Sequence, residues 1–253
     1  MKLLVALVYT IIVVAGKTVD PNIELPSSLK ICRLEDPNRD ECIKNSIQKF
    51  LPTLRDGIEN IGIQSMDPFI YEKLSFNIQN NNLLMGKVDV KDVLNYGFSS
   101  GVIQSLESNI TDEEMSINGK VFFPKMFVSG KYESNVAFNA FRFVSRGQYN
   151  VTMKDITAKW NIKSKLVDVN GEAHMKAHYF EIIPEVGSMK FSISGLFPDK
   201  SLNQVFSDFF TENWKIFYDE ALPDIRNQWE PLVLDISNKI FSNFPFKKLL
   251  LKD

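Results

Sequence analysis

The stretch SLNQVFSDFFTENWKIFYDEALPDIRNQWEPLVLDISNKIFSNF, residues 201–244, carries the longest helical pattern in the chain. Its apolar residues recur at gaps of three, four and seven, which places one continuous stripe along a helix. The stripe consists of Leu202, Val205, Phe206, Phe209, Phe217, Ala221, Ile225, Trp229, Leu232, Ile236 and Ile240. A helix of this length is about 60 Å long. Something elongated must therefore cover the stripe.

Two prolines, Pro223 and Pro231, interrupt this pattern. Each removes a backbone hydrogen bond and costs about 3 kcal/mol in a straight helix interior. Because the stripe keeps its phase across both, we predict a bent but continuous helix. The aromatic residues here are either ordinary core or the lining of an apolar cavity, and the local sequence leaves both readings open. They are Phe206, Phe209, Phe210, Trp214 and Phe217.

The chain begins with MKLLVALVYTIIVVAG, residues 1–16, which has a positive start, an apolar run and small residues at its end. This pattern is typical of a secretory signal peptide, and the run is shorter than the roughly twenty residues of a membrane span. We predict a secreted, extracellular protein with residues 17–253 as one domain and no stable membrane insertion. The formal net charge of −2 gives no reason to expect nucleic acid or an anionic membrane as a partner.

Cys32 and Cys42 are the only cysteines. In a secreted protein such a close pair predicts a disulfide, worth roughly 2–3 kcal/mol by loop-closure entropy. No further ligands for a metal lie nearby, so no metal site is predicted. We expect the next helix to be capped by Asp40 and to bend or end near Gly57. Its apolar stripe is Ile43, Ile47, Phe50, Leu54, Ile58 and Ile61.

From about residue 74 to residue 193 the apolar pattern changes to a period of two, which predicts six to eight antiparallel strands. Turns are expected at Asn80-Asn81-Asn82, Asn118-Gly119 and Asn170-Gly171, since Asn-Gly accepts the positive φ of a tight hairpin. One face of the sheet is apolar and the other polar, as in a sheet covered on one side. Together with the helices this predicts an α+β fold. Glycosylation sequons begin at Asn109 and Asn150.

Residues that carry enzyme chemistry are scarce. The only histidines, His174 and His178, would lie about 13 Å apart on the polar face of a strand, too far for one metal ion. The sequence has no nucleophile elbow, phosphate-binding loop, dinucleotide fingerprint or zinc motif. We therefore predict a protein that is not an enzyme and that needs no cofactor. A hydrolase whose nucleophile lies in space beside one of the histidines remains an alternative.

Several stretches together resemble the insect takeout and haemolymph juvenile-hormone-binding proteins, over essentially the whole mature chain. They are LPSSLKICRLEDPNRDECIKNSIQKFLPTLRDGIENIGIQSMDP near the start, then KVDVKDVLNYGFSS, FPKMFVSGKY and GQYNVTMKDI, and the C-terminal stretch from LFPDK to FKKL. Cys32 and Cys42 lie in the position of the family's N-terminal disulfide. Because this is the only cysteine pair, the chain is more similar to the takeout branch of the family. Residues 134–146 lack the glycine and proline expected of the family there.

The resemblance implies an elongated fold in which a highly curved antiparallel sheet wraps the long C-terminal helix around an internal hydrophobic tunnel. It also implies a carrier that sequesters a lipophilic ligand such as a terpenoid hormone or a fatty acyl lipid. The lining residues that we expect from periodicity are Phe122, Met126, Val128, Tyr132, Val205, Phe209 and Phe217. We expect a monomer with a small hydrophobic ligand. A secreted interaction protein with a filled interior is the alternative, and an open interior would distinguish the two.

Overall fold

The computed structural model describes residues 29–80, 84–138 and 141–251. The predicted signal peptide and two of the three turn asparagines after Gln79, Asn81 and Asn82, lie outside these ranges. The strands are β1 Cys32–Arg33, β2 Phe69–Asn80, β3 Leu84–Tyr96, β4 Val102–Ile110, β5 Glu114–Phe138, β6 Phe141–Val169, β7 Glu172–Ser194 and β8 Leu250–Leu251. The α-helices are α1 Arg39–Phe50, α2 Lys200–Glu212, α3 Trp214–Asn243 and α4 Phe246–Leu249. Short 3-10 turns are Leu51–Leu54, Glu59–Ile61 and Phe98–Ser100.

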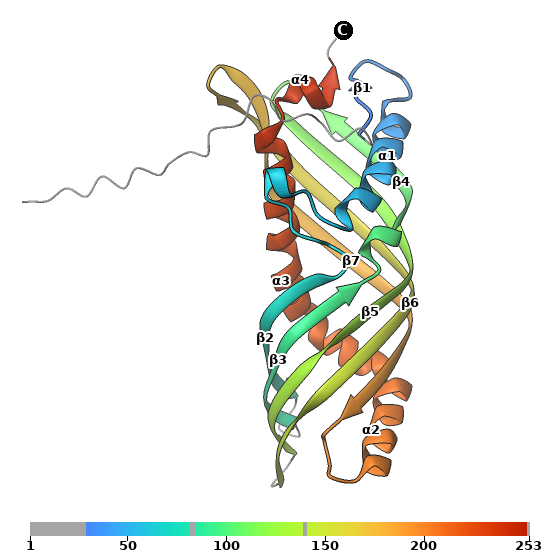
Figure 1. The fold of residues 1–253 in the computed structure, drawn as a ribbon. Coiled ribbons are helices and arrows are strands. Elements are labelled where there is room, and N and C mark those ends of the chain that lie inside the picture. Colours follow the sequence, from blue (N-terminus) through green and yellow to red (C-terminus); the bar gives the residue numbers. More distant parts are fainter. Residues whose placement is uncertain (1–28, 81–83, 139–140, 252–253) are drawn as a thin grey trace, which may run out of the picture.

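Six strands form one open, strongly curved antiparallel sheet in the order β2-β3-β5-β6-β7, with β4 paired to the first half of β5. The sheet and α3 run along the same long axis, and the sheet curls around the helix (Figure 1). Both α2 and α3 pack along β7. The predicted α+β fold with a curved sheet and a long C-terminal helix is confirmed. None of the described helices is both long enough and apolar enough to span a membrane.

One of the predicted Asn-Gly turns is present in the structure and the other is not. Asn170 and Gly171 form the β6–β7 hairpin with φ values of 55° and 83°, as predicted. The prediction of a turn at Asn118-Gly119 is wrong, because both residues lie inside β5, a strand of 25 residues. A Cβ atom on Gly119 would lie 2.3 Å from the ring of Trp160 on β6. This glycine therefore makes room for a cross-strand indole.

The C-terminal helix breaks at Asn213, ten residues before Pro223, the first of the two prolines. Asn213 has non-helical backbone angles (φ −106°, ψ 20°), and its backbone N–H and side-chain amide both donate to the carbonyl of Phe209. α3 then continues for 30 residues through Pro223 and Pro231. The prediction of one continuous helix is therefore wrong at Asn213 and right at the prolines.

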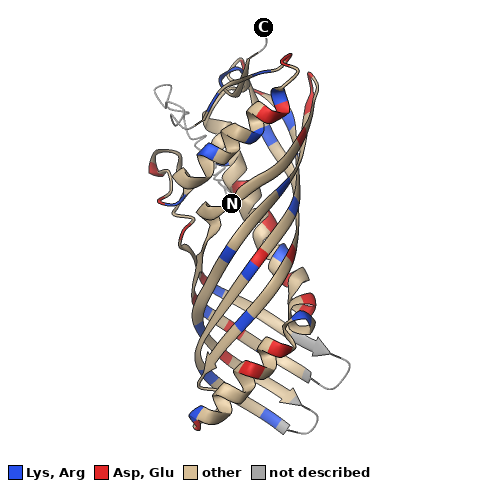
Figure 2. Ribbon diagram, turned by 90° about the vertical axis from the view of Figure 1, so that its right-hand side faces the viewer, with Lys and Arg blue, Asp and Glu red and all other residues tan. Residues whose placement is uncertain are grey.

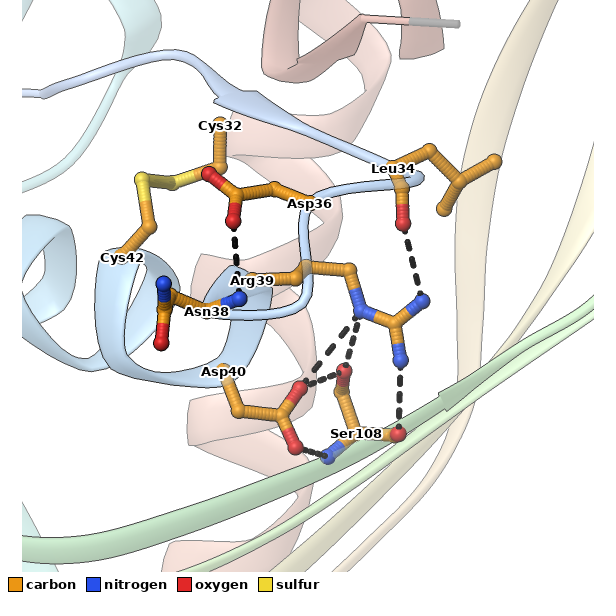
Figure 3. Close-up of polar contacts among 8 residues, drawn as sticks. All are labelled: Cys32, Leu34, Asp36, Asn38, Arg39, Asp40, Cys42 and Ser108. Carbon is orange, nitrogen blue, oxygen red and sulfur yellow. Dashed lines mark hydrogen bonds and ion pairs between the residues drawn. A yellow bond between two sulfur atoms is a disulfide. The ribbon is translucent and has the colours of Figure 1, made fainter.

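α1 is tied to β4 and to the chain before it (Figure 3). The Cys32–Cys42 disulfide is formed, with the Cα atoms 5.9 Å apart. The Arg39 guanidinium donates to the carbonyls of Leu34 (3.1 Å) and Ser108 (3.2 Å) and to the Ser108 hydroxyl (3.1 Å). These contacts fix the disulfide-bonded end of α1 against the sheet.

Asp40 does not cap α1, which begins one residue earlier, at Arg39. Its carboxylate accepts hydrogen bonds from the backbone N–H and the hydroxyl of Ser108. Partial burial raises the pKa of Asp40, but these bonds and the Arg39 charge outweigh burial, and the net pKa is lowered. The helix also ends earlier than predicted, at Phe50, and is followed by the 3-10 turn Leu51–Leu54, which contains Pro52.

The best-packed core lies at the end of the molecule that holds α1 and α4. Phe244 is fully buried there against Ile61, Ile63, Met66 and Phe69. Trp229 packs with the buried cluster of Val121, Phe123, Ile156 and Ala158, and Leu234 and Phe241 pack with Met115, Ile117, Ile162 and Met175. The C-terminal half of α3 thus fills the concave side of the sheet at this end.

Candidate functional site

α2 contacts the edge of β7 through a polar stripe. The Ser207 hydroxyl accepts from the Ile193 N–H (2.9 Å), and the Thr211 hydroxyl accepts from the Phe191 N–H (3.0 Å). Asn203 accepts from the Phe197 N–H and donates to the Phe197 carbonyl, both at 2.9 Å. Asn203 and Ser207 are buried, at 8% and 3% exposure. The stripe supplies the hydrogen bonds that a neighbouring strand would otherwise give to β7.

The apolar side of α2 turns toward the concave face of the sheet. Phe210 lies 6.0 Å, ring centre to ring centre, from Phe191 of β7, and Phe206 lies 4.8 Å from Phe197. The aromatic cluster continues through Phe209 to Phe217 at the start of α3. Large apolar side chains nevertheless stay uncovered on this side. They are Leu202 (46% exposed), Val205 (59%), Phe206 (38%) and Phe209 (50%).

The concave face of the sheet at the same end carries an apolar cluster without any helix residue among its described members. Val90, Val93 and Tyr132 are its buried centre. Around them pack Tyr71, Leu74, Phe76, Val88, Val128, Tyr149, Ile193 and Leu196, all only partly buried. We call this cluster, with the apolar side of α2 and Phe217, the open interior. Its apolar surfaces are left partly accessible, unlike the opposite end, where α3 covers the sheet.

Three tyrosine hydroxyls belong to the open interior. The Tyr132 hydroxyl donates to the Ser194 carbonyl at 3.0 Å. The Tyr71 hydroxyl is buried without a hydrogen-bond partner among the described residues. Burial raises the pKa of both Tyr71 and Tyr149 to about 12, so both stay protonated at neutral pH. Tyr71 therefore offers an unused donor inside an apolar surface, at a cost in stability unless a partner arrives.

The predicted lining residues are distributed over three environments. Met126 and Tyr132 are buried, at 4% and 7% exposure, and Val128 packs beside Tyr132. Val205 and Phe209 are exposed on α2, and Phe217 joins the aromatic cluster. Phe122 lies on the outer face of the sheet, opposite Val102 and Thr157 and between the inward-facing Val121 and Phe123. Met126 belongs to the packed cluster that Trp229 contacts, and the other five lie in the open interior.

The sequence reasoning missed several residues of the open interior. Tyr71, Leu74 and Phe76 come from β2, and Tyr149 and Ile193 come from β6 and β7. Their strands alternate between apolar and polar residues, which is the signal that would have found the face. The part of the concave face that no helix covers depends on the path of α2 and α3, which that alternation does not encode.

The two histidines lie in different environments. His174 is 3% exposed, and its Nδ1 lies 3.0 Å from the Phe241 carbonyl of α3. The expectation that both histidines face solvent is therefore wrong for His174, because the end of α3 covers it, whereas His178 is exposed. Across the described ranges no three histidine, cysteine or acidic residues gather in a way that would hold a metal ion.

Two hollows lie outside the open interior. One of about 270 Å³ follows α3 and is lined by Asp219, Leu222, Pro223, Arg226, Asn227 and Glu230. Arg226 bonds there to Glu181 and Glu230 at 2.9 and 2.8 Å. The other, of about 490 Å³, lies at the ends of β2, β3, β5 and β6 and is lined by Asn77, Met85, Gly86, Lys87, Asn135, Ala137 and Arg142. Each lining combines charged and amide groups with a few apolar side chains, which suits an apolar ligand less well than the open interior does.

Comparison with known proteins identifies a family and a similar solved structure. The family model for haemolymph juvenile hormone binding protein matches residues 6–251. The crystal structure of Epiphyas postvittana Takeout 1 superposes with a TM-score of 0.68 at 20% identity, over 88% of this chain and all of that one. A lipopolysaccharide binding protein structure gives a TM-score of only 0.37 at 12% identity, over 79% of this chain and 37% of that one. No curated protein sequence matches.

Proposed function

Since the chain belongs to the haemolymph juvenile hormone binding protein family, we propose that it is a secreted, non-enzymatic carrier of a small lipophilic molecule held in the open interior. The fold it shares with the takeout structure provides the elongated, helix-lined sheet that such a carrier needs. The disulfide between Cys32 and Cys42 fits an extracellular protein.

The observation that carries this proposal is the incomplete covering of apolar side chains on both sides of the open interior. On α2, Val205 is 59% exposed and Phe209 is 50% exposed. No described helix residue belongs to the cluster on the facing sheet. A ligand that covers about 400 Å² of apolar surface gains about 10 kcal/mol before the cost of immobilisation, at about 25 cal/mol per Å². That gain is enough to hold a molecule of the size of a fatty acid or a sesquiterpenoid.

The proposed ligand class follows from the ratio of apolar to polar side chains in the open interior. The open interior supplies mainly phenylalanine, valine and leucine side chains, and Tyr71 supplies a buried donor that has no partner among the described residues. These groups suit a long apolar molecule with a hydrogen-bond acceptor, such as a terpenoid ester or a fatty acyl chain. Both sequon asparagines, Asn109 and Asn150, are exposed on β4 and β6, which supports glycosylation as part of the same proposal.

Native mass spectrometry of the protein secreted from insect cells, followed by solvent extraction, tests the proposal. We expect a stoichiometric apolar mass that leaves on denaturation. A matched pair of variants checks its location. Leu202→Asp places a charge on the apolar side of α2, and Ser201→Asp places the same charge on an exposed neighbour in the same helical turn.

Both substitutions lie in the first turn of α2, where an acidic residue is tolerated by the helix dipole. We expect Leu202→Asp to lower ligand occupancy and Ser201→Asp to retain it. A protein that carries no apolar mass, and that takes up neither fatty acids nor terpenoids when they are offered, would refute the carrier function and favour a role for the outer surface.

A further inference from the structure

The outer face of the two central strands carries a row of lysines. Figure 2 shows blue segments repeated along the long strands on this side of the molecule. The row contains Lys120 and Lys125 of β5, Lys154, Lys159 and Lys163 of β6, and Lys190 of β7. All are exposed except Lys120, which is partly buried. We call these six residues the lysine row.

The register places lysines directly against each other. Lys120 is paired with Lys159, and Lys125 is paired with Lys154, across the β5–β6 ladder. Like charges opposite each other on one face destabilise a sheet. Lysines often protect the edge strands of a sheet from adding another strand. That explanation does not apply here, because β5 and β6 are both internal strands.

Few carboxylates neutralise the lysine row. Glu107, Asp155 and Glu185 are exposed on the same region of the described structure. The only ion pair with the row there joins Lys159 to Glu185 at 3.7 Å, with both side chains about two-thirds exposed, which contributes little. Lys163 lies over the Tyr179 ring, 5.2 Å from its centre. The region is therefore positive although the chain has a formal net charge of −2.

Apolar side chains lie between the paired lysines. Phe122 is opposite Thr157, in the stretch between the two lysine pairs, and Val102 of β4 is its other neighbour. Ile183 of β7 is opposite Lys159. Val102 and Ile183 are 48% and 43% exposed. Apolar side chains rimmed by flexible cations match the boundary between lipid headgroups and acyl chains.

We propose that the lysine row is a docking surface for an anionic phospholipid membrane, on which the protein lies with its long axis in the membrane plane. From Lys154 to Lys163 the row spans about 30 Å at about 3.3 Å per residue. A convex sheet touches a flat surface along such a line. The row holds only lysines, whose point charges suit a diffuse layer of headgroups, whereas a defined acidic site on a protein favours arginine.

Vesicle co-sedimentation tests this docking. We compare phosphatidylcholine vesicles with vesicles that contain 30% phosphatidylserine, and expect binding only to the latter, weakened by added salt. Lys125→Gln with Lys154→Gln removes one lysine pair and should weaken binding about 25-fold, from about fivefold per lysine. Lys215→Gln with Lys248→Gln is the control: it changes the net charge equally at exposed helix positions and should change binding less than twofold.

Equal binding to both kinds of vesicle, no binding to either, or equal losses in both double variants would overturn the proposal. So would capture by poly-glutamate combined with no binding to phosphatidylserine vesicles, which would assign the row to an acidic protein. Uptake of a fluorescent fatty acid is measured on the same variants. Because the lysine row lies outside the open interior, normal uptake with lost vesicle binding separates docking from the carrier function.

Discussion

Phe209 provides the most direct test of the open interior. Its ring lies in the middle of the aromatic cluster and is 50% exposed. A covered phenylalanine buries about 200 Å², so about 100 Å² is already buried in the protein and about 100 Å² is available to a ligand. At about 25 cal/mol per Å², each half is worth about 2.5 kcal/mol.

Phe209→Ala should therefore have two effects of similar size. Alanine retains the Cβ, which reduces each contribution from about 2.5 to about 2 kcal/mol. The free energy of unfolding should therefore fall by about 2 kcal/mol, and the ligand dissociation constant should rise about 30-fold. Urea denaturation measures the first effect, and displacement of a fluorescent fatty acid measures the second. A residue that is only part of the packed core would show the loss of stability without the loss of affinity.

The matched control is Phe127→Ala. Phe127 lies on the outer face of β5, where its ring centre is 6.0 Å from that of Tyr96. The variant loses the same side chain from a partly covered position and should change affinity by less than about twofold. Unchanged affinity in Phe209→Ala, or an equal loss in Phe127→Ala, would refute the assignment of the ligand to the concave side.

Three further predictions concern the scaffold. Replacing Cys32 and Cys42 by serine should speed hydrogen exchange in α1 far more than in β6, and equal acceleration in both would show that the bridge braces the whole fold. Asn238→Ala removes bonds to both the N–H (2.8 Å) and the carbonyl (2.9 Å) of Ala177, so urea denaturation should show a loss of about 1–3 kcal/mol. Burial raises the pKa of Tyr71 from 10.0 to about 12. The stability that the protonated Tyr71 hydroxyl contributes through this shift is complete below pH 10 and is lost as the pH rises to 12. Tyr71→Phe should therefore flatten the decline of the unfolding free energy between pH 10 and pH 12 without lowering stability at neutral pH. A clear loss of stability at neutral pH in Tyr71→Phe would mean that the hydroxyl has a partner.

The sequence predicted the element types well because periodicity reports burial directly. The Asn170-Gly171 hairpin followed from backbone chemistry, since both residues accept positive φ. The same dipeptide at Asn118-Gly119 misled because a glycine also serves where a neighbouring side chain needs space, here Trp160. Strands of 23 to 29 residues are far longer than the usual five or six, which made an internal turn look necessary.

The direction of side chains was harder to predict. Phe122, Met126, Val128 and Tyr132 share one parity and were therefore assigned to one face. The alternation shifts by one at Pro124, opposite Asp155, whose φ is +53°. This local irregularity in both strands sends Phe122 outward and Met126 inward. A strict alternation of inward and outward residues cannot predict such a shift.

The apolar stripe of the C-terminal helix was found correctly, but its contact with the sheet was not. On α2 the buried residues are Asn203 and Ser207, whereas Val205 and Phe209 are exposed. The unpaired N–H groups of β7 need acceptors, and the polar stripe supplies them. This requirement comes from the position of β7 at the edge of the sheet, which depends on the order of all the strands.

The contact between the helices and β7 has a consequence for aggregation. An open sheet has two edges, and exposed edges are templates on which a second molecule can add a strand. β7, with 23 residues, has its edge occupied by side chains such as Ser207, Thr211 and Asn238. β2, the other end of the sheet order, has only 12 residues and carries the adjacent charges Glu72 and Lys73. The helices therefore prevent another strand from adding to the edge at β7, and the charged side chains of β2 disfavour strand addition at the other edge.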